Sequence, residues 1–120
     1  MRADLEIIAD WIQPKARVLD MGCGDGELLH HLAHHKSVDG LGLEIDHDNI
    51  TDCIARGVNV IDKNLDEGLA SIDDSTFDNV VMTQALQVMH RPDFIVEEML
   101  RIGNERIVTF PNFAHWRARF

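Results

Sequence analysis

The feature that most constrains this chain is a short apolar strand that runs directly into glycines and then into a helical pattern. Residues 17–20 have the character of a buried strand, and Gly22, Gly24 and Gly26 follow at every second position. An apolar stripe with helical spacing comes next, formed by Leu28, Leu29, Leu32 and Ala33. Because a strand, a glycine turn and a helix in this order do not make a hairpin, the segment predicts an α/β fold.

The rest of the chain alternates strand-like and helix-like segments. Four further stretches rich in Val, Ile and Leu are expected to be strands: residues 38–45, 58–61, 77–83 and 106–110. Three amphipathic helices are expected over residues 3–12, 46–56 and 92–102, the second capped by Asp46 and the third opened by Pro92. This alternation predicts one domain over residues 1–120, with a parallel sheet and right-handed crossovers.

The composition disfavours several classes of partner. Acidic residues outnumber basic ones 21 to 11, and the resulting formal charge of -10 repels the phosphate backbone of nucleic acids. The locally basic residues 115–120 are too few to define a nucleic-acid surface. No apolar run approaches the roughly 20 residues of a membrane helix, and the first residues do not have the layout of a secretion signal. We expect a cytoplasmic protein that binds neither nucleic acid nor membranes.

The cysteines and histidines do not form a recognisable metal site. Cys23 and Cys53 belong to no CxxC pair, so both are expected to be reduced thiols, with Cys53 on an apolar helix face. Histidines at positions 30, 31, 34 and 35 form two i, i+4 pairs of the kind that can hold a metal, but no third ligand is evident. We interpret these histidines as a solvated helix face and expect no bound metal.

The glycine segment is expected to cradle a ligand, because ligands of doubly wound sheets bind where the winding direction reverses. Its spacing does not suit a dinucleotide, since Glu27 stands where that fingerprint needs a third glycine. Asp20 at the first strand tip can instead hold an ammonium, and the loop amides can meet a carboxylate. Glu44, at the end of the second strand, can accept both hydroxyls of a ribose. A ligand that joins an amino acid to an unphosphorylated adenosine matches both groups.

Two motifs resemble those of the Rossmann-like S-adenosylmethionine-dependent methyltransferases. Residues 18–26, VLDMGCGDG, are similar to the first motif of that superfamily, and residues 42–46, GLEID, to its second. More narrowly, segments along nearly the whole chain resemble the family of the bacterial methionine biosynthesis protein MetW: residues 2–5, 26–29, 42–46, 54–58, 82–87 and 107–113. The resemblance implies a doubly wound, mostly parallel sheet of order 3-2-1-4-5 with helices on both faces. It also implies S-adenosylmethionine or S-adenosylhomocysteine as cofactor and homoserine O-acetyltransferase as partner.

The motifs and the resemblance together assign the site residues. The expected cofactor-binding residues are Asp20, Gly22, Cys23, Gly24, Gly26, Glu44, Ile45, Asn64, Leu65 and Thr83. Asn64 stands where such folds usually have an acidic residue that meets adenine, and its amide oxygen can still accept from the adenine amino group. His90 and Gln84, after the fourth strand, are expected to bind or deprotonate a methyl acceptor. Methyl transfer needs few obligatory side chains, because alignment supplies much of its rate.

The resembled fold normally adds two strands after the fifth, whereas this sequence stops at Phe120. We therefore expect a sheet truncated after the fifth strand, with that strand as an exposed edge through which a homodimer forms. The favoured function is a methyltransferase-like protein of methionine biosynthesis. Two alternatives stay open, namely a non-catalytic regulatory module that binds the cofactor and a small-molecule methyltransferase unrelated to methionine synthesis.

Overall fold

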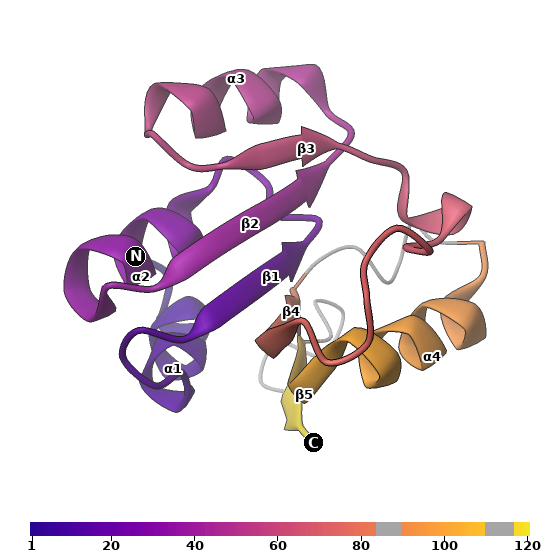
Figure 1. The fold of residues 1–120 in the computed structure, drawn as a ribbon. Coiled ribbons are helices and arrows are strands. Elements are labelled where there is room, and N and C mark those ends of the chain that lie inside the picture. The colour runs from indigo at the N-terminus through magenta and orange to yellow at the C-terminus, as the bar shows by residue number, and fades with distance from the viewer. Residues whose placement is uncertain (84–89, 110–116) are drawn as a thin grey trace.

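A single open sheet organises the computed structural model, which describes residues 1–83, 90–109 and 117–120 (Figure 1). Its parallel strands are β1 (Arg17–Met21), β2 (Asp39–Glu44), β3 (Val60–Asp62), β4 (Phe77–Met82) and β5 (Gly103–Thr109). They lie in the order β3-β2-β1-β4-β5, and an antiparallel strand β6 (Arg117–Arg119) follows β5. The expected α/β class, the parallel pairing and the order 3-2-1-4-5 are confirmed.

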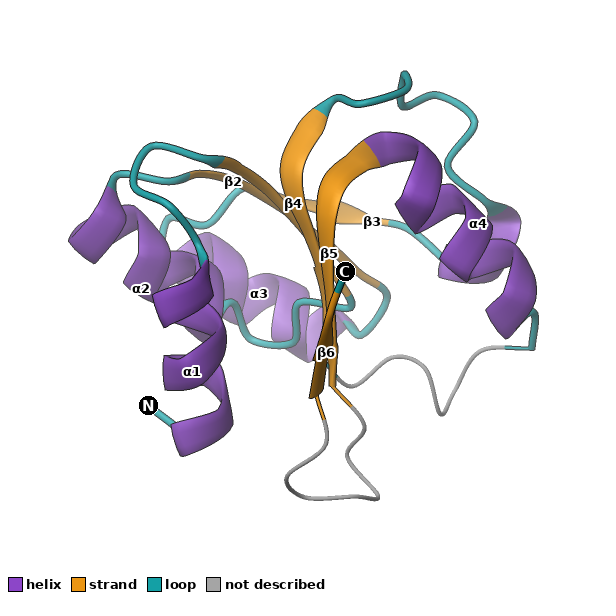
Figure 2. Cartoon of the chain, turned by 90° about the horizontal axis from the view of Figure 1, so that it is seen from below, coloured by secondary structure: helices purple, strands orange, loops and turns teal. Residues whose placement is uncertain are grey.

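Helices cover both faces of the sheet, as Figure 2 shows edge-on. One face carries α1 (Ala3–Trp11), α2 (Glu27–Lys36) and α3 (His47–Ala55), and the other carries α4 (Pro92–Ile102) and the 3-10 turn η1 (Leu65–Glu67). Because side chains alternate along a strand, β1 sends Val18 into the first core and Leu19 into the second. Within the described ranges, no helix is long and apolar enough to span a bilayer.

Local interactions at two helix ends position the elements near the sheet. The carboxylate of Asp46 caps α3 as expected, accepting from the amide of Asn49 at 3.0 Å. The last turn of α1 has no basic residue of its own. The ammonium of Lys36, from the end of α2, donates instead to the carbonyl oxygens of Ala9 and Ile12 at 2.6 and 2.7 Å. This cation satisfies the carbonyl groups at the end of α1 and joins the two helices.

Element boundaries differ from the expected ones where pairing decides them. The fifth strand begins at Gly103 rather than at residue 106, because Gly103 pairs with Phe77 at the start of β4. The third strand starts at Val60 rather than at residue 58, since its pairing with β2 begins there. Ala33, expected in the apolar stripe of α2, is exposed.

The expected truncation after the fifth strand is wrong. Strand β6 pairs antiparallel with β5, from Ile107 opposite Arg119 to Thr109 opposite Arg117. Backbone bonds between Arg106 and Phe120, at 2.6 and 2.8 Å, extend this pairing. Strand β5 is therefore covered along this stretch, and the premise of the expected homodimer, an exposed fifth strand, is wrong. The sequence Arg-Ala-Arg has little strand propensity, so it becomes a strand because an unpaired backbone edge lies beside it.

Candidate functional site

The candidate site lies at the carboxyl end of β1, where the winding of the sheet reverses. From β1 the chain passes to β2 and β3 on one side, and β4 then pairs with β1 on the other. The register places Asp20 between Gly42 of β2 and Val81 of β4. Ligands of doubly wound sheets bind at this position, so the topology confirms that the glycine segment follows the strand at the switch point.

The glycine segment is a tight turn held to the sheet by its own backbone. Gly22 and Cys23 donate to the carbonyl oxygen of Leu43 at 2.8 and 3.0 Å, which fixes the turn against the end of β2. Gly24 and Gly26 have φ values of +59° and +85°, in the left-handed region that favours glycine. Gly26 also lacks space, because a Cβ atom there would lie 3.0 Å from the sulfur of Cys53.

Beside this turn is a cavity of about 250 Å³. Five of the expected cofactor-binding residues line it, namely Asp20, Gly22, Cys23, Gly24 and Thr83. It is also lined by six residues that were not assigned from the sequence: Arg2, Leu5, Asp25, Glu27, Leu28 and Asn49. Asp25 belongs to the glycine turn itself. The other five come from the N-terminal segment, α1, the start of α2 and the first turn of α3, and sequence patterns do not reveal that such distant segments meet.

Asp20 is the most unusual group of the cavity. It is 2% exposed, and among the described residues its Oδ1 atom has no hydrogen-bond partner. Burial and, second, the negative charge of Glu44 raise its pKa to about 7. A buried carboxylate oxygen without a donor is costly, and a cation in the cavity would compensate it. The surroundings of Asp20 are thus suited to an ammonium group, and ammonium binding by Asp20 stays a prediction.

Glu44 braces the glycine turn instead of lining the cavity. Its Oε1 accepts from the amide of Gly24 at 2.9 Å, and its Oε2 accepts from the amides of Ile45 and Asp46 at 3.2 and 3.0 Å. The carboxylate therefore faces the turn, and it raises the pKa of Asp20. Ribose binding by Glu44 stays a prediction.

Four other expected cofactor residues lie outside the cavity lining, namely Gly26, Ile45, Asn64 and Leu65. Gly26 belongs to the turn itself, where its backbone has a positive φ. The side chain of Asn64 caps η1, its Oδ1 accepting from the amide of Asp66 at 3.0 Å. Leu65 is buried in the second core, and Ile45 is exposed after β2. Because β3 pairs with β2 up to Asp62 opposite Glu44, these residues follow the carboxyl ends of the strands, at the same end of the sheet as the glycine turn.

Of the two expected acceptor-binding residues, His90 is the one that the described ranges include. Gln84 lies outside the described ranges. His90 is exposed and does not line the cavity, and its amide donates to the carboxylate of Asp66 at 3.1 Å. Thr83 lines the cavity, and its carbonyl oxygen accepts from the hydroxyl of Thr109 at 2.5 Å, which ties the ends of β4 and β5 together.

The charges around the cavity favour a cationic ligand over a phosphate. Three carboxylates line it, those of Asp20, Asp25 and Glu27, against one guanidinium, that of Arg2. The carboxylate of Glu44 lies behind the turn. Glu27 occupies the first turn of α2, where a pyrophosphate would otherwise meet free amides. The rings of the two histidine pairs of α2 are tilted against each other, with centroids 4.2 and 4.3 Å apart. No cluster of three or more metal-binding side chains occurs within the described ranges.

Comparisons with known proteins agree with this arrangement. A family model described as methionine biosynthesis protein MetW matches residues 2–120. A curated relative, the bifunctional methionine biosynthesis protein MetXA/MetW of Rhodopirellula baltica, is 34% identical over 127 residues, which are 99% of this chain and 20% of that protein.

Solved structures share the fold. A SAM-dependent methyltransferase of Thermotoga maritima, described as a possible histamine N-methyltransferase, is 25% identical with a TM-score of 0.70, over 88% of this chain and 49% of that chain. A SAM-dependent methyltransferase of Geobacter sulfurreducens, solved with S-adenosyl-L-homocysteine, is 19% identical with a TM-score of 0.70, over 90% of this chain and 47% of that one. The chain thus spans less than half the length of these two proteins.

Proposed function

The chain belongs to the family of the methionine biosynthesis protein MetW, and from this premise we propose that its cavity binds S-adenosylmethionine or S-adenosylhomocysteine. One observation carries the proposal: within the part of the chain that the structure describes, an oxygen of buried Asp20 has no hydrogen-bond partner at the cavity beside the glycine turn. The α-ammonium group of either ligand would supply the missing partner of Asp20. The methyltransferase fold of the neighbours, one of which was solved with S-adenosyl-L-homocysteine, supports the same ligand class.

The amides of the glycine turn, which were expected to meet the ligand carboxylate, already have acceptors within the protein. The amides of Gly22, Cys23 and Gly26 donate to carbonyl oxygens of the protein, and that of Gly24 donates to Glu44. The amide of Leu28 is a better donor, because it lies in the first turn of α2, where an α-helix leaves its N–H groups without intrahelical acceptors. The positive end of the helix dipole adds to this preference for an anion.

When bound, S-adenosylmethionine supplies an electrophilic methyl group on a sulfonium. The residues of this chain would hold and align it: Asp20 at the ammonium, Leu28 at the carboxylate and the braced turn beneath. For acceptor binding or deprotonation we propose His90 and Gln84, after β4. We propose a small molecule as acceptor; the net charge of -10 disfavours a nucleic acid.

We further propose that the chain acts beside homoserine O-acetyltransferase. The relative from Rhodopirellula baltica carries the MetXA and MetW names on one chain, and this chain matches 20% of it. Two activities on one polypeptide are held at high effective concentration, so separate homologues of the two parts are candidates for association. Copurification of the separately expressed proteins, quantified by size exclusion with light scattering, tests the association.

Titration calorimetry with S-adenosylmethionine, S-adenosylhomocysteine and NAD tests the cofactor proposal. Both sulfur ligands are expected to bind and NAD is not. Asp20→Asn should weaken binding by at least tenfold, about the value of one charge-assisted hydrogen bond. Asp73→Asn, which removes an exposed carboxylate on the connection before β4, is the matched control and should bind like the wild type. Equal binding of NAD, or unchanged affinity in Asp20→Asn, would reject the proposal.

A second candidate is a regulatory module that binds the cofactor without chemistry. One observation favours it: among the described cavity residues the titratable groups are carboxylates, Cys23 and Arg2, and His90 is not among them. Release of S-adenosylhomocysteine from labelled cofactor, with and without the acetyltransferase, separates the two. Turnover that His90→Ala abolishes supports the enzyme, and saturable binding with no turnover in either condition supports the module.

A further inference from the structure

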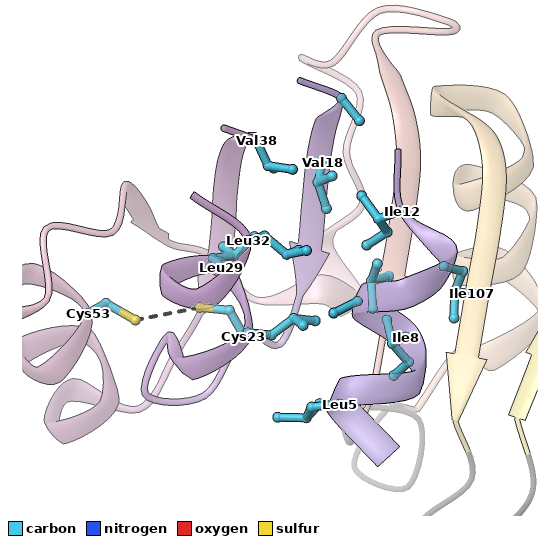
Figure 3. Packing of buried hydrophobic residues seen from close by; sticks show 14 residues of the cluster. Leu5, Ile8, Ile12, Val18, Cys23, Leu29, Leu32, Val38, Cys53 and Ile107 are labelled. Atoms are coloured by element: carbon cyan, nitrogen blue, oxygen red, sulfur yellow. Dashed lines mark hydrogen bonds between the residues drawn. The ribbon is translucent and has the colours of Figure 1, made fainter. Parts of the chain in front are cut away.

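Two thiols meet directly behind the glycine turn. Cys23 belongs to the turn and Cys53 to α3, and their sulfur atoms are 3.7 Å apart (Figure 3). Both cysteines are free and buried. Figure 3 shows the two side chains pointing toward one another from separate segments of the chain.

The space for these sulfurs is provided by glycines of the two motifs. A Cβ atom on Gly42 would lie 2.5 Å from the sulfur of Cys23, and one on Gly26 would lie 3.0 Å from that of Cys53. Both thiols also face the carbonyl oxygen of Gly24, Cys53 at 3.2 Å and Cys23 at 3.7 Å. The dithiol is therefore fitted to the turn that forms one wall of the cavity.

The two thiols differ in access. Cys23 is 8% exposed and lines the cavity, whereas Cys53 is fully buried and is not among the lining residues. A small reagent would therefore reach Cys23 first, through the cavity. Cys53 can then react only with a group already attached to Cys23.

We propose that Cys23 and Cys53 form a reversible disulfide when a small disulfide such as oxidised glutathione enters the empty cavity, and that a bound cofactor prevents it. The sulfur atoms must approach from 3.7 Å to about 2.05 Å, which requires side-chain rotation with a small shift of the turn. The protective effect of the cofactor rests on the proposed function, whereas formation of the disulfide does not.

The reaction is a pair of thiol–disulfide exchanges. The thiolate of Cys23 attacks one sulfur of oxidised glutathione, its S–S bond breaks, and the glutathione thiolate that leaves takes up the proton that Cys23 has lost. The thiolate of Cys53 then attacks the sulfur of Cys23 and expels the second glutathione, which is protonated in the same way. One protein disulfide and two reduced glutathione molecules result, so two electrons pass from the protein to the oxidant.

The exchange is expected to be slow and to accelerate with pH. Burial raises the pKa of both thiols, and the charge of Asp20 raises that of Cys23 further. Because the thiolate is the reacting form, the rate should rise about tenfold per pH unit across the neutral range.

The test uses the full chain, incubated with oxidised glutathione at pH 8, then alkylated and digested with trypsin. Trypsin cuts after Arg17, Lys36 and Arg56, which separates the cysteines onto peptides 18–36 and 37–56. The expected product is these two peptides linked by a disulfide, which dithiothreitol separates. Recovery of both cysteines alkylated, or of stable glutathione adducts without the linked peptide, would overturn the proposal.

Single variants test the order of attack, after circular dichroism has shown that they are folded. Cys53→Ser should stop at a glutathione adduct on Cys23, because no resolving thiol remains. In Cys23→Ser, Cys53 should be modified at least tenfold less than Cys23 is in Cys53→Ser, because the thiol that reacts first with the oxidant is absent. Equal modification of the two variants would show that access does not run through the cavity.

Protection by the cofactor is measured on the wild type. At a hundred times its Kd, S-adenosylhomocysteine should slow formation of the linked peptide by about a hundredfold, because about 1% of the sites stay empty. An unchanged rate while calorimetry shows the ligand bound would reject protection through the cavity. If calorimetry shows no binding, the proposed function fails and protection with it, while the digest without ligand still decides the disulfide.

Discussion

Replacing Asp20 with asparagine should stabilise the empty protein increasingly as the pH rises. Burial and the charge of Glu44 raise the pKa of Asp20 from its ordinary value of 3.8 to about 7. Because the pKa of Asp20 is higher in the folded than in the unfolded state, protonation of its carboxyl stabilises the folded state. This stabilisation is fully present below the unfolded-state pKa and is lost as the pH rises through the folded-state pKa. Roughly three pKa units correspond to about 4 kcal/mol, of which about 2 kcal/mol is lost between pH 5.5 and 8.5.

Urea unfolding of both proteins across pH 5.5 to 8.5 measures this effect. The free energy of unfolding of Asp20→Asn minus that of the wild type should grow by about 2 kcal/mol over the interval. The cost of burying an asparagine amide does not depend on pH, so it cancels from the change. The exposed variant Asp73→Asn should follow the wild type. A difference in unfolding free energy that stays constant with pH would refute the inference that burial raises the pKa of Asp20.

Cofactor binding should show the opposite trend in the wild type. A protonated Asp20 cannot pair with an ammonium, so affinity for S-adenosylmethionine should fall below pH 7, toward tenfold per pH unit. Calorimetry over the same interval should show no such dependence in Asp20→Asn. An equal pH dependence in both proteins would assign it to another group.

Three further substitutions test the surroundings of the site. Glu44→Gln removes a charge that raises the pKa of Asp20, so the pH midpoint of cofactor binding should move down in calorimetry. Arg101→Met removes a guanidinium that donates to two backbone carbonyls of the connection before β4, at 2.6 and 2.9 Å, and urea unfolding should show a loss of about 2–3 kcal/mol. Gly42→Ala would place a methyl group 2.5 Å from the sulfur of Cys23, and thermal unfolding should reveal a loss of about 1–3 kcal/mol.

The periodicity of the chain predicted the centre of the sheet well because strands β1 and β4 are buried on both faces. Strand β1 shows this directly, since Val18 and Leu19 enter different cores and both must be apolar. Strand β6 carries no such signal. Its pairing with β5 comes from backbone groups, which any sequence provides, so its existence depends on the neighbouring edge.

The position of a site residue could be predicted where the local sequence alone fixes it. Asp20 follows from the end of β1, and the left-handed turn of Gly24 and Gly26 follows from the glycine spacing. Asn49 and Leu28 were not assigned, because they reach the cavity from the starts of α3 and α2 through helix packing. Glu44 was recognised as important, but its contact with the amide of Gly24 comes from the tertiary turn.

By itself, the sequence determined the order of the helices and of strands β1 to β5 along the chain and the position of the glycine turn, because these depend on local periodicity and on the conformations that glycine permits. Only the tertiary structure decided the electrostatic state of Asp20 and the meeting of Cys23 with Cys53. Burial and proximity are properties of the packed chain, and residues far apart in sequence create them only when the sheet and helices have come together.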